Sequence, residues 1–214
     1  MRMIRLSEEY LARIAAGEDA LRPRNTGPAA VALGSFDGLH LGHRALIEGV
    51  KDAKRRHGLR SSIVFTFRRH PRLVLGGADR PFLLTTWREK LALLQDAGVD
   101  VVVAADFCPE LSRLDYRRFV KDFLVDFLGM THMVAGYDVH LGAEREGDAE
   151  RLAALGSELG YAFEVHEAAR IEGATISSSA IRTALEEGRV PYACRLLGRP
   201  YALWGEVTPG DGRG

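Results

Sequence analysis

Residues 34–43 read Gly-Ser-Phe-Asp-Gly-Leu-His-Leu-Gly-His, and they directly follow the short apolar run Ala29–Leu33. A short apolar run that ends at a glycine-rich turn is typical of a buried strand. Apolar residues at helical spacing predict a helix over residues 43–57. The free N–H groups and the dipole at the N-terminus of a helix both favour an anion. This strand–turn–helix unit therefore predicts a phosphate site.

The same alternation of strand and helix continues along the chain. Short continuous apolar strands between helices favour a parallel sheet covered on both faces, so we expect an α/β fold. In such sheets ligands bind where strands end and the next helices begin. Further strands are expected at residues 60–67, 99–104, 132–136 and 161–166, and further helices at residues 7–16, 86–97, 115–127, 148–160, 178–187 and 190–197.

The composition is that of a folded domain. Among 214 residues, 46% are hydrophobic and 27% are charged, which favours a buried core over disorder. Lys+Arg and Asp+Glu both number 29, so charge gives no case for a nucleic-acid partner.

No run approaches the ~20 apolar residues of a membrane span, and the N-terminus lacks a signal-peptide pattern. Two distant cysteines, Cys108 and Cys194, favour a reduced, cytoplasmic location.

Two histidines stand out in the opening stretch. His40 and His43 are three residues apart, so on a first helical turn they would point the same way and donate hydrogen bonds to phosphate oxygens. An ordinary turn with surface histidines and a zinc site are the alternatives, but no third ligand sits at a recognisable spacing. The P-loop pattern and the G-x-G-x-x-G pattern are both missing. The position after the first strand favours phosphate binding.

A second motif lies at residues 175–182, which read Thr-Ile-Ser-Ser-Ser-Ala-Ile-Arg. Serines at the start of a helix can simply cap it. They can also place hydroxyl and N–H groups beside an anion, and Arg182 could reach the same anion with its planar guanidinium. The combination of serines with Arg182 indicates a triphosphate clamp.

Together these motifs resemble the paired signature of the nucleotidylyltransferase superfamily. The F-D-G-x-H-x-G-H form is similar to that of bacterial bifunctional riboflavin kinase/FMN adenylyltransferases. Residues 66–71 resemble that family's T-F-x-P-H-P segment, and residues 136–148 resemble its G-x-[DN]-F-x-F-G…G-[DN] loop. Residues 196–201 resemble the junction between its two modules. The resemblance spans about residues 29–214, in the expected order.

The resemblance implies a domain organisation. A Rossmann-like nucleotidylyltransferase fold, a parallel sheet with helices on both faces, would occupy residues 29–188, and residues 1–28 would be an N-terminal extension. Residues 189–214 would hold a C-terminal helix and a remnant of the junction to a kinase module. The family's P-T-x-N kinase motif is missing from that remnant, so no riboflavin kinase activity is expected.

The resemblance also implies a reaction and its partners. AMP would pass from ATP to FMN, giving FAD and pyrophosphate, through in-line attack of the FMN phosphate on the α-phosphorus. That nucleophile is already an anion, so catalysis would rest on positioning and charge neutralisation. Mg²⁺ is expected with ATP, with unknown protein ligands. ATP and FMN are thus the expected partners, without nucleic acid or membrane, and the oligomeric state stays open.

Roles follow from the resemblance for individual residues. The residues expected to be catalytic are His40, His43 and Arg182. Those expected to bind the nucleotide are Gly34, Ser35, Phe36, Asp37, Gly38, Gly42, Asp138, Ser177, Ser178, Ser179 and Arg182. Those expected on the FMN side are Phe67, Arg68, Arg69, His70 and Pro71.

Five residues depart from the family pattern, of which Ser35, where Asn is common, is a tolerable change. Arg68 and Arg69 stand where an acidic residue and a proline are usual, and Val139 and Leu141 replace two phenylalanines. The two arginines could assist an anionic substrate or could belong to a solvated loop. The loss of two aromatic faces removes stacking surface. These departures keep open a nucleotidylyltransferase with a different phosphate-bearing acceptor or with CTP. A non-catalytic nucleotide- or flavin-binding module is a separate alternative.

Overall fold

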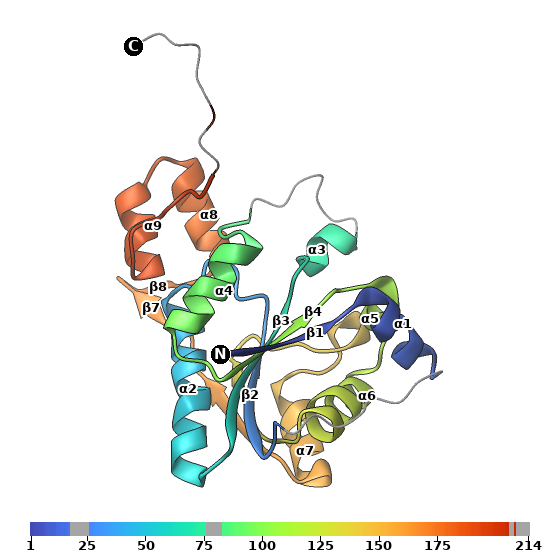
Figure 1. Ribbon diagram of the computed structural model, residues 1–214. Helices are drawn as coiled ribbons and strands as arrows, with labels where there is room; N and C mark the ends of the chain where they lie inside the picture. Colours follow the sequence, from blue (N-terminus) through green and yellow to red (C-terminus); the bar gives the residue numbers. More distant parts are fainter. Residues whose placement is uncertain (18–25, 76–82, 206–207, 209–214) are drawn as a thin grey trace.

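The computed structural model describes residues 1–17, 26–75, 83–205 and 208, so the last part of the expected junction remnant lies outside the described residues. One sheet of six parallel strands forms the centre of the molecule, in the order β1-β4-β3-β2-β5-β6 (Figure 1). The strands are β1 (Arg2–Leu6), β2 (Ala29–Leu33), β3 (Ser61–Phe67), β4 (Val101–Ala105), β5 (Met130–Gly136) and β6 (Ala162–His166).

The strand order reverses beside β2. The chain runs from β2 to its neighbour β3 and on to β4, and it then returns to form β5 on the other side of β2. Connections on opposite sides of a strand leave a crevice outside its carboxyl end, which is where open α/β sheets bind ligands.

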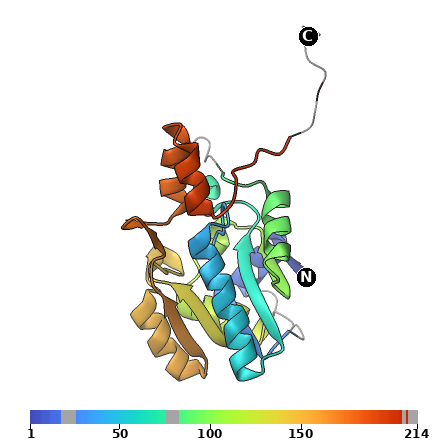
Figure 2. The same ribbon diagram turned by 90° about the vertical axis from the view of Figure 1, so that its left-hand side faces the viewer.

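Helices cover both faces of this sheet. α2 (Leu41–His57) and α4 (Trp87–Asp96) lie on one face, and α1 (Glu8–Ala16), η1 (Phe119–Phe127) and α7 (Ala149–Leu159) lie on the other (Figures 1 and 2). The remaining elements are α3 (Pro71–Val74), α5 (Pro109–Ser112), α6 (Tyr116–Arg118), η2 (Ala143–Arg145), the hairpin β7 (Arg170–Ile171) and β8 (Ala174–Thr175), α8 (Ser178–Glu186) and α9 (Val190–Leu197).

The alternation of side chains along the strands divides the core. Val31 and Phe65 point into the cluster formed with α1, η1 and α7, while Ala32 and Val64 point into the cluster formed with α2 and α4. All four side chains are fully buried. This two-sided burial explains why the strands read as continuous apolar runs, and it confirms the expected α/β, Rossmann-like fold.

A third apolar cluster joins α8 and α9. Ile181, Ala184, Leu196 and Leu197 pack together there with Leu84, which precedes α4. In Figure 2, α8 and α9 lie beyond the N-terminal end of α2, next to the carboxyl ends of the strands. The second sequence motif is thereby brought to the first.

The structure also contains elements that the sequence analysis did not identify. Residues 2–6 form an edge strand that pairs with β4 in parallel, so the segment expected to be an extension contributes to the main sheet. The helix expected over residues 115–127 is present, but residues 119–127 form a π-helix. Among the described residues, no helix combines the length and the apolar character that crossing a membrane requires.

Candidate functional site

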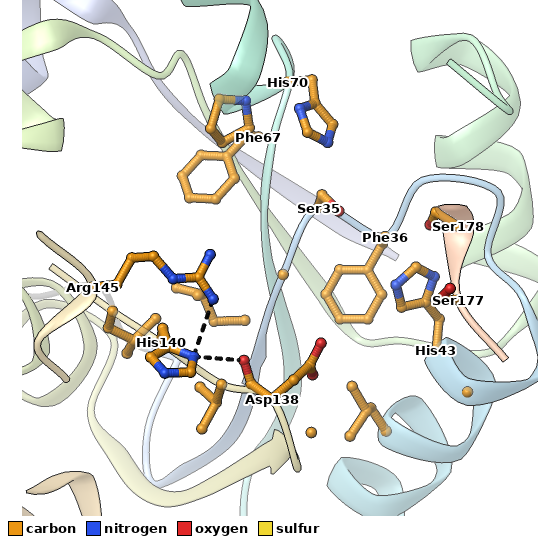
Figure 3. A pocket seen from close by; sticks show the side chains of 18 of the residues that line it. Ser35, Phe36, His43, Phe67, His70, Asp138, His140, Arg145, Ser177 and Ser178 are labelled. Carbon is orange, nitrogen blue, oxygen red and sulfur yellow. Dashed lines mark hydrogen bonds between the residues drawn. The ribbon is translucent and has the colours of Figure 1, made fainter. Parts of the chain in front are cut away.

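A cavity of about 910 Å³ opens at the carboxyl ends of the central strands (Figure 3). Its wall combines the loops after β2, β3 and β5 with the beginnings of α2 and α8. Three segments contribute most of the polar side chains, namely Leu33–His43, Gly136–Arg145 and Ile176–Arg182. Most of the residues singled out in the sequence thus meet at one place.

The loop after β2 has an unusual backbone. Phe36 and Leu39 have φ angles of 48° and 40°, in the left-handed region that non-glycine residues rarely occupy, and both side chains are buried. Between them Gly38 has a φ of 80°, and a Cβ there would lie 2.7 Å from the side chain of Leu84. Backbone strain of this kind concentrates at functional sites and persists only when the surroundings enforce it.

His40 and His43 stack against each other at the start of α2. Their ring centroids are 3.7 Å apart and the ring planes differ by 17°. The side chain of His40 caps the helix, because its Nδ1 accepts a hydrogen bond of 3.3 Å from the backbone N–H of His43. A Cβ on Gly42 would come within 3.2 Å of the His40 ring, so glycine makes room for it.

Both histidines are neutral near pH 7. Burial lowers the pKa of His40 to about 4, although the charge of Asp37 opposes this effect. Burial, followed by the neighbouring His40 and Lys90, holds the pKa of His43 well below its ordinary value. Since Nδ1 of His40 accepts a hydrogen bond, the ring proton of His40 is on Nε2. The two histidines that were expected to donate hydrogen bonds are thus uncharged imidazoles, each with one ring N–H group.

The serines at the start of α8 have identifiable partners. Ser177 caps the helix by accepting from the N–H of Ala180 at 3.1 Å, and Ser178 donates to the backbone carbonyl of Asp37 at 2.9 Å. Together with Ser179 they also line the cavity. Ser177 therefore combines capping with cavity lining, and Ser178 ties the start of α8 to the loop after β2.

Asp37 is a buried centre of hydrogen bonds. Its carboxylate accepts from the backbone N–H groups of Leu84 and Thr85 at 3.1 Å and from Nη2 of Arg182 at 2.5 Å. Arg182 lines the cavity, whereas the described lining residues include neither Asp37 nor Gly38. Asp37 thus orients Arg182 and the segment before α4. Its expected role in nucleotide binding stays a prediction, and so does that of Gly38.

Only some of the residues expected on the FMN side line the cavity. Phe67, His70 and Pro71 line the cavity. Arg68 turns to Asp106, with 3.3 Å between Nη1 and Oδ1, and stands over the ring of Trp87. Arg69 is exposed, and the described lining residues contain neither arginine. The roles predicted for Arg68 and Arg69 gain no support from this arrangement.

The loop after β5 forms the rim. Asp138 lies at the cavity, and its backbone carbonyl is 2.9 Å from Nδ1 of His140 (Figure 3). Nη2 of Arg145 lies 3.2 Å from the same ring nitrogen. Val139 and Leu141 also line the cavity, and both pack against the main core. The predicted nucleotide contact of Asp138 stays a prediction.

Comparison with known proteins decides the family. The family model described as FAD synthetase matches residues 22–180. The chain belongs to the FAD synthetase family.

Relatives from bacteria agree with the FAD synthetase match. The chain is 36% identical over 181 residues to the bifunctional riboflavin kinase/FMN adenylyltransferase of Escherichia coli K12, covering 85% of this chain and 58% of that protein. The protein of the same description from Listeria monocytogenes is 37% identical over 187 residues, with coverages of 86% and 58%. The chain therefore spans less than two thirds of these relatives.

A solved structure shares the fold of this FAD synthetase family member. The structure described as a macrolide-efflux protein from Streptococcus pneumoniae superposes with a TM-score of 0.76 at 24% identity, covering 94% of this chain and 72% of that one. At this identity the similarity concerns the fold alone.

Several cavity residues of this FAD synthetase family member were missed by sequence reasoning. Phe107, Leu111, Leu114 and Phe119 line an apolar part of the cavity, and they come from the segment that runs from the end of β4 to the first residue of η1. No local motif marks them, because they read as ordinary core residues. Phe67 joins them through an edge-to-face contact with Phe107, with centroids 5.3 Å apart. The cavity thus has an apolar aromatic region as well as a polar one.

Metal ligands are scarce at the site. Among the described residues, no group of three or more His, Cys, Asp and Glu side chains could hold a metal ion. The carboxylates that line the cavity are Asp138, Glu144 and Glu167. Mg²⁺ commonly binds through one or two carboxylates plus substrate phosphates. These side chains fit a magnesium ion that arrives with a triphosphate, and they do not form a cage of their own.

Proposed function

We propose that this chain is an FMN adenylyltransferase, which transfers AMP from ATP to FMN and yields FAD and pyrophosphate. One observation carries the proposal. In a chain of the FAD synthetase family, a single cavity joins two helix N-termini with histidine, serine and arginine side chains to an aromatic, apolar region. The first region suits a polyphosphate and the second suits a flat apolar ring.

Phosphate binding is supported by the geometry of the polar region. α2 and α8 both direct their N-termini to the cavity, and the free N–H groups of a helix N-terminus attract anions. Arg182 adds a guanidinium to this region, and its contact with Asp37 fixes where that group lies. ATP phosphates bound here would face the neutral rings of His40 and His43.

The reaction chemistry follows from these groups. The FMN phosphate is already an anion at neutral pH, so the site needs no general base. The N–H group of each neutral imidazole can donate to phosphoryl oxygens as charge develops on them, and it does so without like-charge repulsion between the two stacked rings. Mg²⁺ bound to ATP would offset further charge on the triphosphate. Catalysis then rests on alignment of the two phosphates.

Flavin binding is supported by the apolar region. Phe67 and Phe107 present aromatic surface there, and Phe119 and Leu111 extend it. This surface replaces in part the stacking area that the aliphatic Val139 and Leu141 do not provide. The cavity volume of about 910 Å³ lies near the upper end of the range typical of ligand sites, as two substrates require.

The aliphatic Val139 and Leu141 favour one alternative, a nucleotidylyltransferase for another phosphate-bearing acceptor or for CTP. Arg68 and Arg69 no longer argue for it, because Arg68 pairs with Asp106 and Arg69 is exposed. A non-catalytic binding module is disfavoured, since His40, His43 and Arg182 all lie at the cavity. We also propose a cytoplasmic location, where ATP is abundant and both cysteines would stay reduced.

A comparison of acceptors tests the proposal. The purified chain is given ATP and Mg²⁺ with FMN, with riboflavin, or with simple phosphate monoesters, and each adenylylated product is separated by chromatography. We expect FAD to form from FMN much faster than any other product, and CTP to replace ATP poorly. If another phosphate monoester reacts faster than FMN, the proposed acceptor is wrong and that monoester replaces it.

A further inference from the structure

Lys90 is a buried cation that the proposed reaction leaves without a role. It lies on α4, 8% of its surface is exposed, and it is not among the described residues that line the cavity. Burial lowers its pKa to about 8, although the charge of Asp37 opposes the shift. The side chain is therefore mainly an ammonium at pH 7. A charge this deeply buried needs partners that stabilise it.

The partners of Lys90 are backbone carbonyls at the ends of two adjacent strands. Nζ donates to the carbonyl of Ser35 at 2.7 Å, just after β2, and to that of Phe67 at 3.3 Å, at the end of β3. The ring of Trp87, with its centroid 5.7 Å from Nζ, adds a cation–π contact. Ser35 and Phe67 both line the cavity, so one ammonium group ties two parts of its wall together from behind.

The orientation of the Ser35 carbonyl affects the residues that follow it in the cavity wall. Residue 36 follows it in a left-handed conformation, and the ring of Phe36 lies with its centroid 5.1 Å from that of His43. The hydroxyl of Thr66 donates to the same carbonyl at 3.1 Å. The orientation of the Ser35 peptide is thus transmitted through Phe36 to His43. Figure 3 shows Ser35 between the side of Phe67 and the side of Phe36 and His43.

We propose that Lys90 is a positioning residue for adenylyl transfer, which holds the Ser35 and Phe67 carbonyls and through them aligns the nucleotide side of the cavity with the acceptor side. This inference rests on the proposed function. Lys90 touches neither substrate in this scheme. Misalignment by about 1 Å can cost about a hundredfold in rate, so its removal should lower kcat and leave substrate binding nearly intact.

The test compares Lys90→Met with Lys51→Met. Lys51 also donates to a backbone carbonyl, that of Ala97 at 3.0 Å, but it lies outside the cavity wall and serves as the matched control. For Lys90→Met we expect kcat for FAD formation to fall by at least about tenfold, with the KM values for ATP and FMN changed by less than about threefold. Lys51→Met should keep the wild-type kcat. Equal effects of the two variants, or an unchanged kcat in folded Lys90→Met, would overturn the inference.

Two further measurements keep the test decisive. If Lys90→Met does not fold, Thr66→Val replaces it, since it removes the other side-chain donor to the Ser35 carbonyl. A lower kcat at unchanged KM supports the inference, and an unchanged kcat overturns it. If the wild-type chain makes no FAD, the proposed function fails. The NMR signals of labelled histidines then test separately whether Lys90 positions His43. Lys90→Met should shift the His43 ring signals and Lys51→Met should not, and a His43 signal that stays in place would overturn the inference.

Discussion

At the scale of single residues, His40 combines a structural and a chemical task. Its Nδ1 caps α2, and the proton on Nε2 remains available for a ligand. Asn at this position would preserve the cap, since an amide oxygen is a good helix cap, but it would remove the titrating ring. The substitution His40→Asn therefore separates the two tasks.

The lowered pKa of His40 makes stability depend on pH in a defined direction. The unfolded chain takes up the proton near pH 6.5, whereas the folded protein does so only near pH 4. The free energy of unfolding should therefore fall as the pH drops from 6.5 to 4, with about 3 kcal/mol from this residue, and be insensitive to it above pH 6.5. Denaturant unfolding of wild type and His40→Asn across this range measures the difference. Parallel pH profiles of the two proteins would contradict the assignment.

His43 should act on the reactive step. We expect His43→Ala to lower kcat by about a hundredfold, because the proposed hydrogen bond strengthens as charge develops on the phosphoryl oxygens. The dissociation constant for ATP, measured by calorimetry, should change by less than about threefold. An equal loss in turnover and in ATP affinity would place His43 in ground-state binding alone.

At the scale of elements, the sequence signals differ in strength. At the start of α4, the side chain of Thr86 accepts from the N–H of Glu89, and the side chain of Glu89 accepts from the N–H of Thr86. This capping box can be read from the sequence because both hydrogen bonds are local. β1 was missed because the exposed Arg2 and Arg5 interrupt its apolar pattern. The π-helix was missed because its buried residues recur every three to four positions, a spacing that also fits an α-helix. Local patterns thus identified the buried strands and the edge strand β6, and they missed the edge strand β1, in which charged residues are interspersed with apolar ones.

The junction between the two sequence motifs depends on Asp37. We expect Asp37→Asn to destabilise the protein by about 3 kcal/mol, because Arg182 loses the buried carboxylate that it contacts. Thermal and denaturant unfolding measure the loss. Glu48→Gln removes the carboxylate of a more exposed pair with Lys51 and should cost less than about 1 kcal/mol. A similarly small loss for Asp37→Asn would show that α8 is held mainly by its apolar contacts.

At the scale of the whole molecule, the first strand is part of the fold. Leu6 is fully buried in the core beside α1, whereas 52% of the surface of Met3 is exposed. We expect Leu6→Ala to lower the free energy of unfolding by about 3 kcal/mol and Met3→Ala by less than about 0.5 kcal/mol. Denaturant titration of both variants compares them. Equal small losses would indicate that residues 1–6 form a separate extension.

The cavity shows how far the sequence predicts a site. Residues 34–43 and 175–182 carry local motifs, and the structure places parts of both motifs around one cavity. The apolar region with Phe107 and Phe119 has no such motif, because it arises from packing between segments far apart in the chain. Lys90 was missed for the same reason, since its partners lie 55 and 23 residues away. The sequence therefore predicts the parts of the site that carry local motifs, and the structure is needed for the parts that depend on long-range contacts.

The central claim is that this cavity joins the phosphate of FMN to the AMP part of ATP. The most direct measurement supplies the chain with FMN, Mg²⁺ and ATP labelled at the α-phosphate, and follows FAD and pyrophosphate together. The account predicts that the label enters FAD and that one pyrophosphate forms for each FAD. A folded chain that binds ATP but forms no labelled FAD, with or without pyrophosphate, would contradict it.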